Sequence, residues 1–542
     1  MVGLRDRRGA GGLSRPRIAT RAAIALLAVP LAACGPPATT VAAPAAPATA
    51  AAPSTPISLA VGDVVELEAV PATRAGDDAA FGVRVEAPAG ARFVAVLVST
   101  RMRDGTRTFR YAPRVGPPEV QSLVERPDRC SAGPVTPAPD RDDGRRADLD
   151  PARARAAAPS LGATRTFQFR TPHGPFPITA RAVAVGDASV VWADASAEHP
   201  AQLDEAFAKE FLGDFERVIL PRARTVFGAP SDRDGDGRVA LLFTPLTSAT
   251  GGIVAFFSGC DLAAGRDCAG SNEAELLYLT PPNAIAPPYN TPRAIKEILA
   301  HELEHLVHHD RKVVRHGKSE DPDAAYLLEG FGALAQDTVG FQAGNLYVTA
   351  AGLTDIDDVS LADLLVPGAE YDRRRDGALR GAAYLLVRWL YDRAGGDRAR
   401  ADGGIDDAGG PTLVHGLLDA SEPVAAAIAH RTGSALADVG VDFYTTLALA
   451  DAKGKTKPCW SYLPTSLDPI TGRQRGADLH AEFHGMALEG PSLQDARRAD
   501  GALREGGVDL LAFAAKPGDP TVGLTVRVDR QAQARLRIVR IQ

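Results

Sequence analysis

Residues 292–309 read PRAIKEILAHELEHLVHH and decide how the centre of the chain folds. Apolar side chains recur there at spacings of three and four residues, at Ile295, Ile298, Leu299, Leu303 and Leu306. This spacing predicts an amphipathic helix. His301 and His305 lie one turn apart on one face of it, so both imidazoles can reach a single zinc ion. The alternative is a surface helix that is only rich in histidine.

A third metal ligand has to come from outside this helix. His308 lies roughly 10.5 Å beyond His301 along a helix axis, too far for one ion that each ligand binds at about 2 Å. The segment YLLEGFGALAQD at 326–337 predicts a second helix, in which Glu329 has apolar neighbours. A carboxylate is costly to bury there unless it meets a cation. Glu329 is therefore the expected third ligand beside His301 and His305, and the alternative is a solvated helix position.

The same segments resemble a known family. HELEH at 301–305, followed by the Glu of LLEGFGALA at 327–335, resembles the gluzincin metallopeptidases. More closely, residues 164–450 are similar to the hyicolysin-type neutral metalloproteases of secreted bacterial proteins. The other segments that carry this resemblance are DRDGDGRVALLF (232–243), IVAFFSGCDL (253–262), SNEAELLYL (271–279) and GAAYLLVRWLYDRAGG (381–396).

The resemblance implies an α+β fold with a zincin-like metallopeptidase domain, in which a mixed sheet is followed by the active-site helices. It implies that His301, His305 and Glu329 bind zinc. Glu302 then acts as general base, taking a proton from the water that attacks the peptide carbonyl and returning it to the leaving amine.

Other residues of the expected site are less well defined by the resemblance. Tyr384 is the first candidate for stabilising the oxyanion, followed by Tyr371 and His309. Ala333 stands where thermolysin-like gluzincins have an Asp that orients a zinc-bound histidine. The groups that support the ligands must therefore differ here, and Asp337 is only a distant candidate.

A second ion site is predicted in an acidic loop. Asp232, Asp234, Asp236 and Gly237 occupy positions 1, 3, 5 and 6 of a pattern used by calcium-binding loops. Position 12 is Phe243, so the usual bidentate Glu is missing. We expect calcium here, and the alternative is an Asp-rich turn between a helix and a strand.

The N-terminus predicts export. Residues 1–21 hold six arginines, and the apolar run at 22–33 is too short to span a bilayer. Residues 1–33 therefore predict a signal peptide. Its end, LAAC with Cys34, resembles the lipobox of bacterial lipoproteins, which implies lipid on Cys34 and attachment to a membrane of the cell envelope. Residues 34–57 are rich in Ala, Pro and Thr, as a tether would be. Secretion without lipid is the alternative.

The remaining cysteines suit an oxidising compartment. With Cys34 lipidated, Cys130, Cys260, Cys268 and Cys459 form an even set that allows two disulfides in three connectivities. A short polar loop between Cys260 and Cys268 favours that pair, which leaves Cys130 for Cys459. A different hypothesis is that Cys130 caps the zinc as a thiolate and keeps the enzyme latent.

The rest of the chain divides by composition. Residues 58–130 contain strand-like runs that predict a small N-terminal β domain. Residues 131–160 are charged and rich in Pro and Ala, which indicates a linker. Residues 161–450 hold the metallopeptidase domain, and 451–542 form a C-terminal extension that ends in predicted strands.

Composition narrows the function further. The chain has 542 residues, is 45% hydrophobic and carries a formal charge of -7, which is unfavourable for nucleic-acid binding. The sequence contains no run of 18 or more apolar residues, so it does not predict a polytopic membrane protein. The sequence predicts a lipid-anchored extracytoplasmic zinc endopeptidase that acts on peptides or proteins. The alternative is an inactive surface lipoprotein that binds or displays a partner through its β domains.

Overall fold

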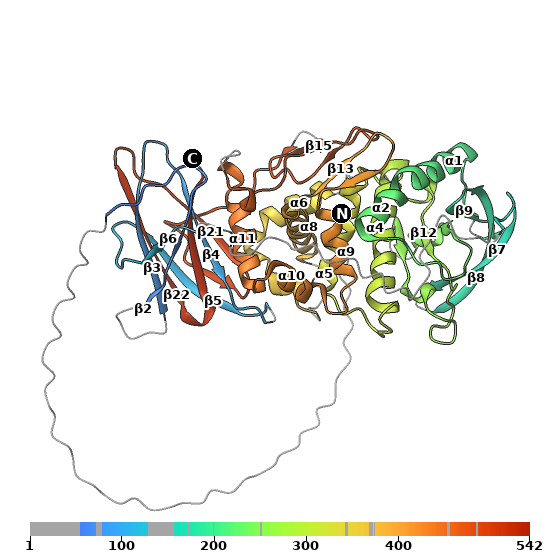
Figure 1. Ribbon diagram of the computed structural model, residues 1–542, viewed down its shortest axis with the longest axis horizontal. Coiled ribbons are helices and arrows are strands. Elements are labelled where there is room, and N and C mark those ends of the chain that lie inside the picture. The colour runs from blue at the N-terminus through green and yellow to red at the C-terminus, as the bar shows by residue number, and fades with distance from the viewer. Residues whose placement is uncertain are drawn as a thin grey trace, which may run out of the picture. The chain divides into compact units, whose positions relative to one another are not determined.

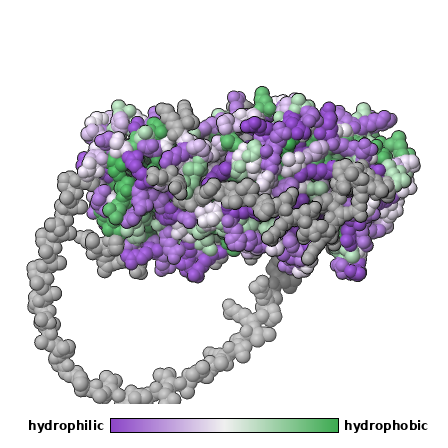
Figure 2. Space-filling view, in the orientation of Figure 1, coloured by the Kyte–Doolittle hydropathy of each residue, from purple (hydrophilic) through white to green (hydrophobic). Residues whose placement is uncertain are grey.

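The structure is a computed structural model. It describes residues 55–71, 78–103, 105–127, 130, 157–171, 173–198, 200–249, 252–341, 345–367, 372, 374–452, 456–483 and 486–542. The expected signal peptide, the lipidation site Cys34, most of the tether, most of the linker and Tyr371 lie outside these residues. Within the described ranges, no helix is long and apolar enough to cross a membrane. On the face shown in Figure 2, hydrophilic residues predominate, with smaller groups of apolar ones between them.

Two sheets built from both ends of the chain face each other across one apolar core. The first has the strand order β19-β21-β4-β23-β1-β6 and the second β2-β3-β22-β5-β20. Figure 1 shows blue N-terminal and red C-terminal strands side by side in them. The strands are β1 Val64–Leu67, β2 Val70–Pro71, β3 Asp78–Glu86, β4 Phe93–Ser99, β5 Thr108–Val115, β6 Val124–Glu125, β19 Gln494–Asp495, β20 Gly501–Arg504, β21 Val508–Phe513, β22 Thr521–Asp529 and β23 Ala534–Arg540.

This pairing corrects the prediction of two separate β units. The β23 strand lies between β1 and β4, and β22 lies between β3 and β5, so segments 58–130 and 451–542 share their sheets. The rings of Phe93 and Phe513 stack at a centroid distance of 5.4 Å in the common core. Alternating hydrophobicity predicts which face of a strand is buried, but it does not identify the strand that pairs with it.

A mixed sheet precedes the central helices. Its order is β11-β12-β10-β9-β8-β7, with β9, β10 and β12 parallel and the other neighbours antiparallel. Its central strands β10 and β12 are buried throughout, as continuous apolar runs predict for parallel strands. The strands are β7 Thr164–Thr171, β8 Gly174–Val185, β9 Ser189–Asp194, β10 Val239–Phe243, β11 Ala255–Phe257 and β12 Leu276–Leu279.

The described residues also form a set of helices. They are α1 Glu205–Asp214, α2 Leu220–Phe227, α3 Leu246–Ala249, α4 Pro292–His309, α5 Ala325–Thr338, α6 Asn345–Thr354, α7 Leu361–Leu365, α8 Asp376–Arg393, α9 Gly410–Leu418, α10 Val424–Thr432 and α11 Leu436–Ala448. Three short antiparallel pairs join β13 Asp397–Ala399 to β14 Ile405–Asp407, β15 Ser466–Leu467 to β16 Gln474–Arg475 and β17 Glu482–Phe483 to β18 Met486–Ala487.

The α4 helix begins and ends where its sequence predicts. The Thr291 side chain accepts a hydrogen bond from the Ala294 amide, and Pro292 occupies the first turn, where it removes no helical hydrogen bond. Its apolar stripe is buried against α5, β11 and β12. A π-helical turn, Asp310–Val314, follows directly. This burial holds one face of α4 against α5, so that the polar groups of both helices meet.

Both disulfides join the pairs favoured above. Cys260 is bonded to Cys268, and Cys130 is bonded to Cys459 across 329 positions of sequence. The latency hypothesis is therefore wrong for this structure, because the Cys130 sulfur is held in a disulfide and is not a thiolate that could bind a metal.

Candidate metal centre

Two helices bring the three expected ligands together. One ligand atom each from His301, His305 and Glu329 lies within 4.8 Å of the other two. The Nε2 atom of His301 is 3.2 Å from Oε2 of Glu329, and the two imidazole rings are 4.6 Å apart between centroids. All three residues are partly buried. The spacing on α4 places the histidines on one face, and the packing of α5 against α4 adds the carboxylate.

The surroundings of these residues fit a zinc ion. Oε1 of Gln336 lies 3.0 Å from Nδ1 of His301, and Oε2 of Glu304 lies 3.0 Å from Nδ1 of His305. Both partners are acceptors, so each Nδ1 carries the proton and each Nε2 keeps its lone pair for a metal. With one carboxylate added, this is the donor set that zinc prefers in sites with an open position.

Neither Glu304 nor Gln336 was predicted from the sequence as a supporting residue. Glu304 follows Leu303 inside the HELEH segment, but its role depends on a side-chain rotamer that the sequence does not specify. Gln336 lies two helical turns after Glu329 and therefore on the same face of α5. This spacing could have identified Gln336 as a neighbour of the expected ligands. Asp337 plays no such part. It accepts hydrogen bonds from Tyr384, Arg388 and the Gly476 amide.

Glu302 lies at the edge of this cluster. Its Oε2 atom accepts a hydrogen bond of 3.1 Å from the Phe257 amide of β11. Burial raises the pKa of Glu302, while the charges of His305 and His301 act in the opposite direction. A carboxylate with a raised pKa that is held by one amide suits proton transfer to and from water.

The His301–Glu329 pair is strongly polarised. Burial alone would lower the pKa of His301, but the hydrogen bond and charge of Glu329 raise it to about 9. Burial alone would raise the pKa of Glu329, but His301, His305 and Arg380 lower it to about 2. The carboxylate of Glu329 is therefore available as an anionic ligand.

Arg380 was not predicted and lies against the same carboxylate. Its guanidinium forms an ion pair with Oε2 of Glu329, and its Nε atom lies 3.0 Å from Oδ1 of Asp376. The side chain is 31% exposed, so its outer edge faces solvent beside the metal ligands. Arg380 lies one turn before Tyr384 on α8.

Tyr384 does not occupy the position expected of it. It is 2% exposed, and its hydroxyl donates a 3.0 Å hydrogen bond to Asp337, which also binds Arg388. The prediction that Tyr384 stabilises an oxyanion is wrong, because α8 is buried along most of its length and this hydroxyl belongs to an interior polar network. His309 packs against the Phe257 ring at 5.7 Å, and burial lowers its pKa.

A glycine makes room for the first ligand. A Cβ atom on Gly332 would lie 2.5 Å from Cε1 of His301. The imidazole therefore occupies the space that a side chain of α5 would otherwise fill.

The acidic loop gathers its three carboxylates. One oxygen each of Asp232, Asp234 and Asp236 lies within 4.8 Å of the others. Burial and the charge of Asp234 raise the pKa of Asp236 to about 6. Each of the three carboxylates also accepts an amide hydrogen bond within the loop, including one of 2.9 Å from Gly237 to Asp232. Both the calcium site and the Asp-rich turn are compatible with this geometry.

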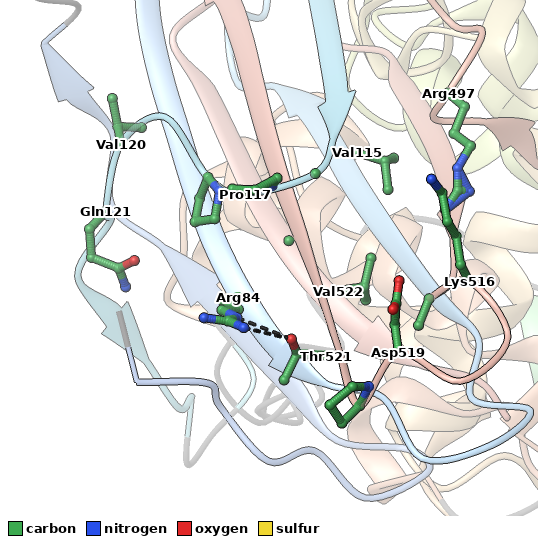
Figure 3. A pocket seen from close by; sticks show the side chains of 15 residues that line it. Arg84, Val115, Pro117, Val120, Gln121, Arg497, Lys516, Asp519, Thr521 and Val522 are labelled. Atoms are coloured by element: carbon green, nitrogen blue, oxygen red, sulfur yellow. Dashed lines mark hydrogen bonds between the residues drawn. The ribbon is translucent and has the colours of Figure 1, made fainter. Parts of the chain in front are cut away.

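The two sheets that contain both N-terminal and C-terminal strands, β1–β6 and β19–β23, form what we call the two-sheet unit. A cavity of about 710 Å³ lies in this unit, and its lining does not include His301, His305 or Glu329. Figure 3 shows Arg84 and Gln121 on one side of it and Arg497, Lys516 and Asp519 on the other. Arg84 donates hydrogen bonds of 3.0 and 3.1 Å to the Thr521 hydroxyl. Polar and cationic side chains thus lie beside apolar ones in a hollow formed by segments from both ends of the chain.

Comparison with known proteins points the same way as the metal ligands. Over 144 residues the chain is 31% identical to the neutral metalloprotease ShpI of Staphylococcus hyicus. The matched region covers 25% of this chain and spans 31% of the relative's length. The chain matches no model of a protein family. The match supports a distant metallopeptidase relationship for the matched region.

Proposed function

We propose that this protein is an exported, lipid-anchored zinc endopeptidase. The observation that carries the proposal is the convergence of His301, His305 and Glu329, with the Glu302 carboxylate beside them. The arrangement of a mixed sheet followed by α4 and α5 supports a zincin-like domain. The N-terminal sequence that ends at Cys34 supports export and a lipid anchor in the bacterial cell envelope.

The residues of the site divide the chemistry between them. His301, His305 and Glu329 would hold zinc, which when bound acidifies water and polarises the peptide carbonyl. Glu302 takes one proton from the attacking water as the new C–O bond forms. It returns that proton to the amine nitrogen as the C–N bond breaks. The Phe257 amide holds the Glu302 carboxylate in place for both transfers.

Arg380 takes the role that was first given to Tyr384. Its guanidinium is fixed by Glu329 and Asp376, and it is partly exposed at the edge of the ligand cluster. A fixed positive charge there stabilises the negative charge that develops on the carbonyl oxygen. Calcium in the loop 232–236 completes the proposal as a structural ion that neutralises the three carboxylates.

The cavity in the two-sheet unit favours a second candidate function. An inactive lipoprotein that binds a partner would use such a hollow, with its cationic lining, for a ligand that carries negative charge. This function requires no chemistry at Glu302.

Casein hydrolysis by the full-length chain separates the two functions. The parent, Glu302→Gln and the exposed control Glu198→Gln are compared, and bound zinc is determined for each. Gln retains the acceptor for the Phe257 amide but cannot take the proton. The proposal predicts that all three hold zinc and that only Glu302→Gln is inactive. Zinc without hydrolysis in the parent would favour the binding lipoprotein.

A further inference from the structure

A second group of side chains that could bind a metal ion lies at the end of α4 and in the loop before α5. One ligand atom each from His308, Asp321 and Asp323 lies within 4.8 Å of the other two. Nε2 of His308 is 3.2 Å from Oδ2 of Asp323 and 3.7 Å from Oδ2 of Asp321. The side chains of His308 and Asp323 are completely buried, and that of Asp321 is 24% exposed. Asp321 therefore leaves a route from solvent into a buried group.

The loop before α5 fixes the two carboxylates. Oδ1 of Asp321 accepts a hydrogen bond from the Asp323 amide, and Oδ1 of Asp323 accepts one from the Val424 amide at the start of α10. In each carboxylate one oxygen is thus used by the backbone. The other oxygen, Oδ2, faces the imidazole of His308.

The distances suit a small divalent cation. Two ligands that each lie about 2.0–2.1 Å from a tetrahedral zinc ion are about 3.3 Å apart. The separations of 3.2 and 3.7 Å from His308 are close to this value. One nitrogen and two carboxylate oxygens also form a donor set that zinc accepts, with water in the fourth position.

The buried charges at this position do not balance. Glu304, Asp321 and Asp323 surround one imidazole. Two lysines lie nearby: Lys312 is buried, with its ammonium held by the carbonyls of residues 420 and 422, and Lys318 is partly exposed. Oε1 of Glu304 and Nδ1 of His308 are fully buried, lie 3.4 Å apart and make no hydrogen bond. Three carboxylates beside one imidazole are costly to bury unless a further positive charge is present.

Without an ion, the alternative is a buried imidazolium. Burial opposes a charge on His308, but its close contacts with the carboxylates of Asp321 and Asp323 and the charge of Glu304 raise its pKa. An imidazolium still leaves the group one charge more negative than a divalent cation bound to neutral imidazole would.

We propose that His308, Asp321 and Asp323 bind a second zinc ion, separate from the one held by His301, His305 and Glu329. In this arrangement Glu304 joins the two sites. Its Oε2 atom lies 3.0 Å from Nδ1 of His305, and its Oε1 atom lies 3.4 Å from Nδ1 of His308. A metal on Nε2 of His308 places the remaining proton on Nδ1, facing Glu304, as metal-bound histidines commonly do. The second ion thereby fixes the carboxylate that orients the first site.

Zinc stoichiometry of the full-length chain tests this proposal without any measure of activity. The chain is dialysed to equilibrium against excess zinc, and bound zinc is counted. Asp321→Asn keeps the Oδ1 acceptor for the Asp323 amide but removes the charge that faces His308. Glu320→Gln removes a neighbouring, exposed carboxylate and serves as the matched control.

The expected counts are two zinc ions in the parent and in Glu320→Gln, and one in Asp321→Asn. His308→Gln is the second variant and should also hold one. His301→Gln should keep the second ion, and its combination with Asp321→Asn should hold none. An Asp321→Asn variant that binds as many zinc ions as the parent would overturn the proposal. Loss of the ion at His301 alone would count against the proposed peptidase and leave the second site standing.

Discussion

Nδ1 of His301 on α4 lies 3.0 Å from Oε1 of Gln336 on α5, which is 35 positions further along the chain. The amide of Gln336 turns back and donates a 2.8 Å hydrogen bond to Glu297, one turn before His301 on α4. The two helices are thus joined by a polar contact that also holds the imidazole of His301, a proposed metal ligand.

Loss of this contact should weaken zinc binding. Gln336→Met keeps the length of the side chain but removes the acceptor for His301. Substitutions of groups that support metal ligands typically reduce affinity about 10–100-fold, and we expect a change of this size. Competition with a chelator measures the affinity, and thermal unfolding checks that the variant is folded. A folded variant with parental affinity would show that Gln336 does not orient His301.

Gly332→Ala should displace the same ligand from the other side. The new methyl group would lie 2.5 Å from Cε1 of His301, so the ring must move. Zinc affinity should fall at least about tenfold, because the ligand leaves its position. Gly213→Ala on α1 is the control, since nothing lies within 4 Å of its added methyl. Ala favours a helix over Gly by about 0.5–1 kcal/mol, so the control should be neutral or slightly more stable. Equal zinc affinity in both variants would contradict the crowding argument.

Arg380→Ala should reduce turnover and spare the metal. Removal of one group that stabilises a developing oxyanion typically costs about 100- to 1,000-fold in kcat, and we expect a loss toward the lower end because Arg380 is partly exposed. Arg380→Lys should recover part of the activity, and Arg374→Ala, at an exposed arginine before α8, should be parental. The measurements are kcat and KM on a peptide substrate, together with the zinc content of each variant. A change confined to KM would assign Arg380 to substrate binding.

Asp509 should make stability depend on pH. Burial and the charge of Asp357 raise the pKa of Asp509 from 3.8 to about 7. The folded protein therefore holds this proton more tightly than the unfolded chain. The resulting stabilisation is complete below pH 3.8 and is lost as the pH rises to about 7. Asp509→Asn stays neutral, so above about pH 7 it should be more stable than the parent, by about 4 kcal/mol at most.

Urea unfolding across this pH range measures the effect. Asp519→Asn, at an exposed position of the same two-sheet unit, should keep the parental pH profile. Parallel profiles for the parent and Asp509→Asn would rule out Asp509 as the titrating group.

Calcium should stabilise the protein through the acidic loop. Burial and the charge of Asp234 raise the pKa of Asp236, and a bound cation would offset both effects. An ion at 100 times its dissociation constant adds about 2.7 kcal/mol to the free energy of unfolding. Asp234→Asn should lose most of this increment, which is measured as the calcium-dependent shift in Tm. Equal shifts in parent and variant would leave the Asp-rich turn as the explanation of the loop.

Local geometry explains what could be predicted at the site. His301 and His305 converge because four residues make about one helical turn, whatever else surrounds the helix. Glu329 was recognised because a carboxylate among apolar neighbours needs a cation. The short loop between Cys260 and Cys268 favoured their pairing for an equally local reason.

Tyr384, Arg380 and Gln336 show where local reasoning ended. A tyrosine and an arginine one turn apart on α8 have the same periodicity, yet one enters a buried network with Asp337 and the other reaches Glu329. Their roles depend on which helices pack against each other and on how far each helix is shifted along its axis relative to its neighbour. No spacing within α8 contains that information.

Local features of this protein follow from short stretches of its sequence. They are the α4 helix with its paired histidines, the short disulfide, the acidic loop and the apolar strands. Only the tertiary structure placed β22 and β23 among N-terminal strands, gave the histidines their partners Gln336 and Glu304, and closed Asp321 and Asp323 around His308. The physical reason is that hydrophobic pattern and helical period act over a few residues. Partners that are distant in sequence are selected by the packing of the whole chain.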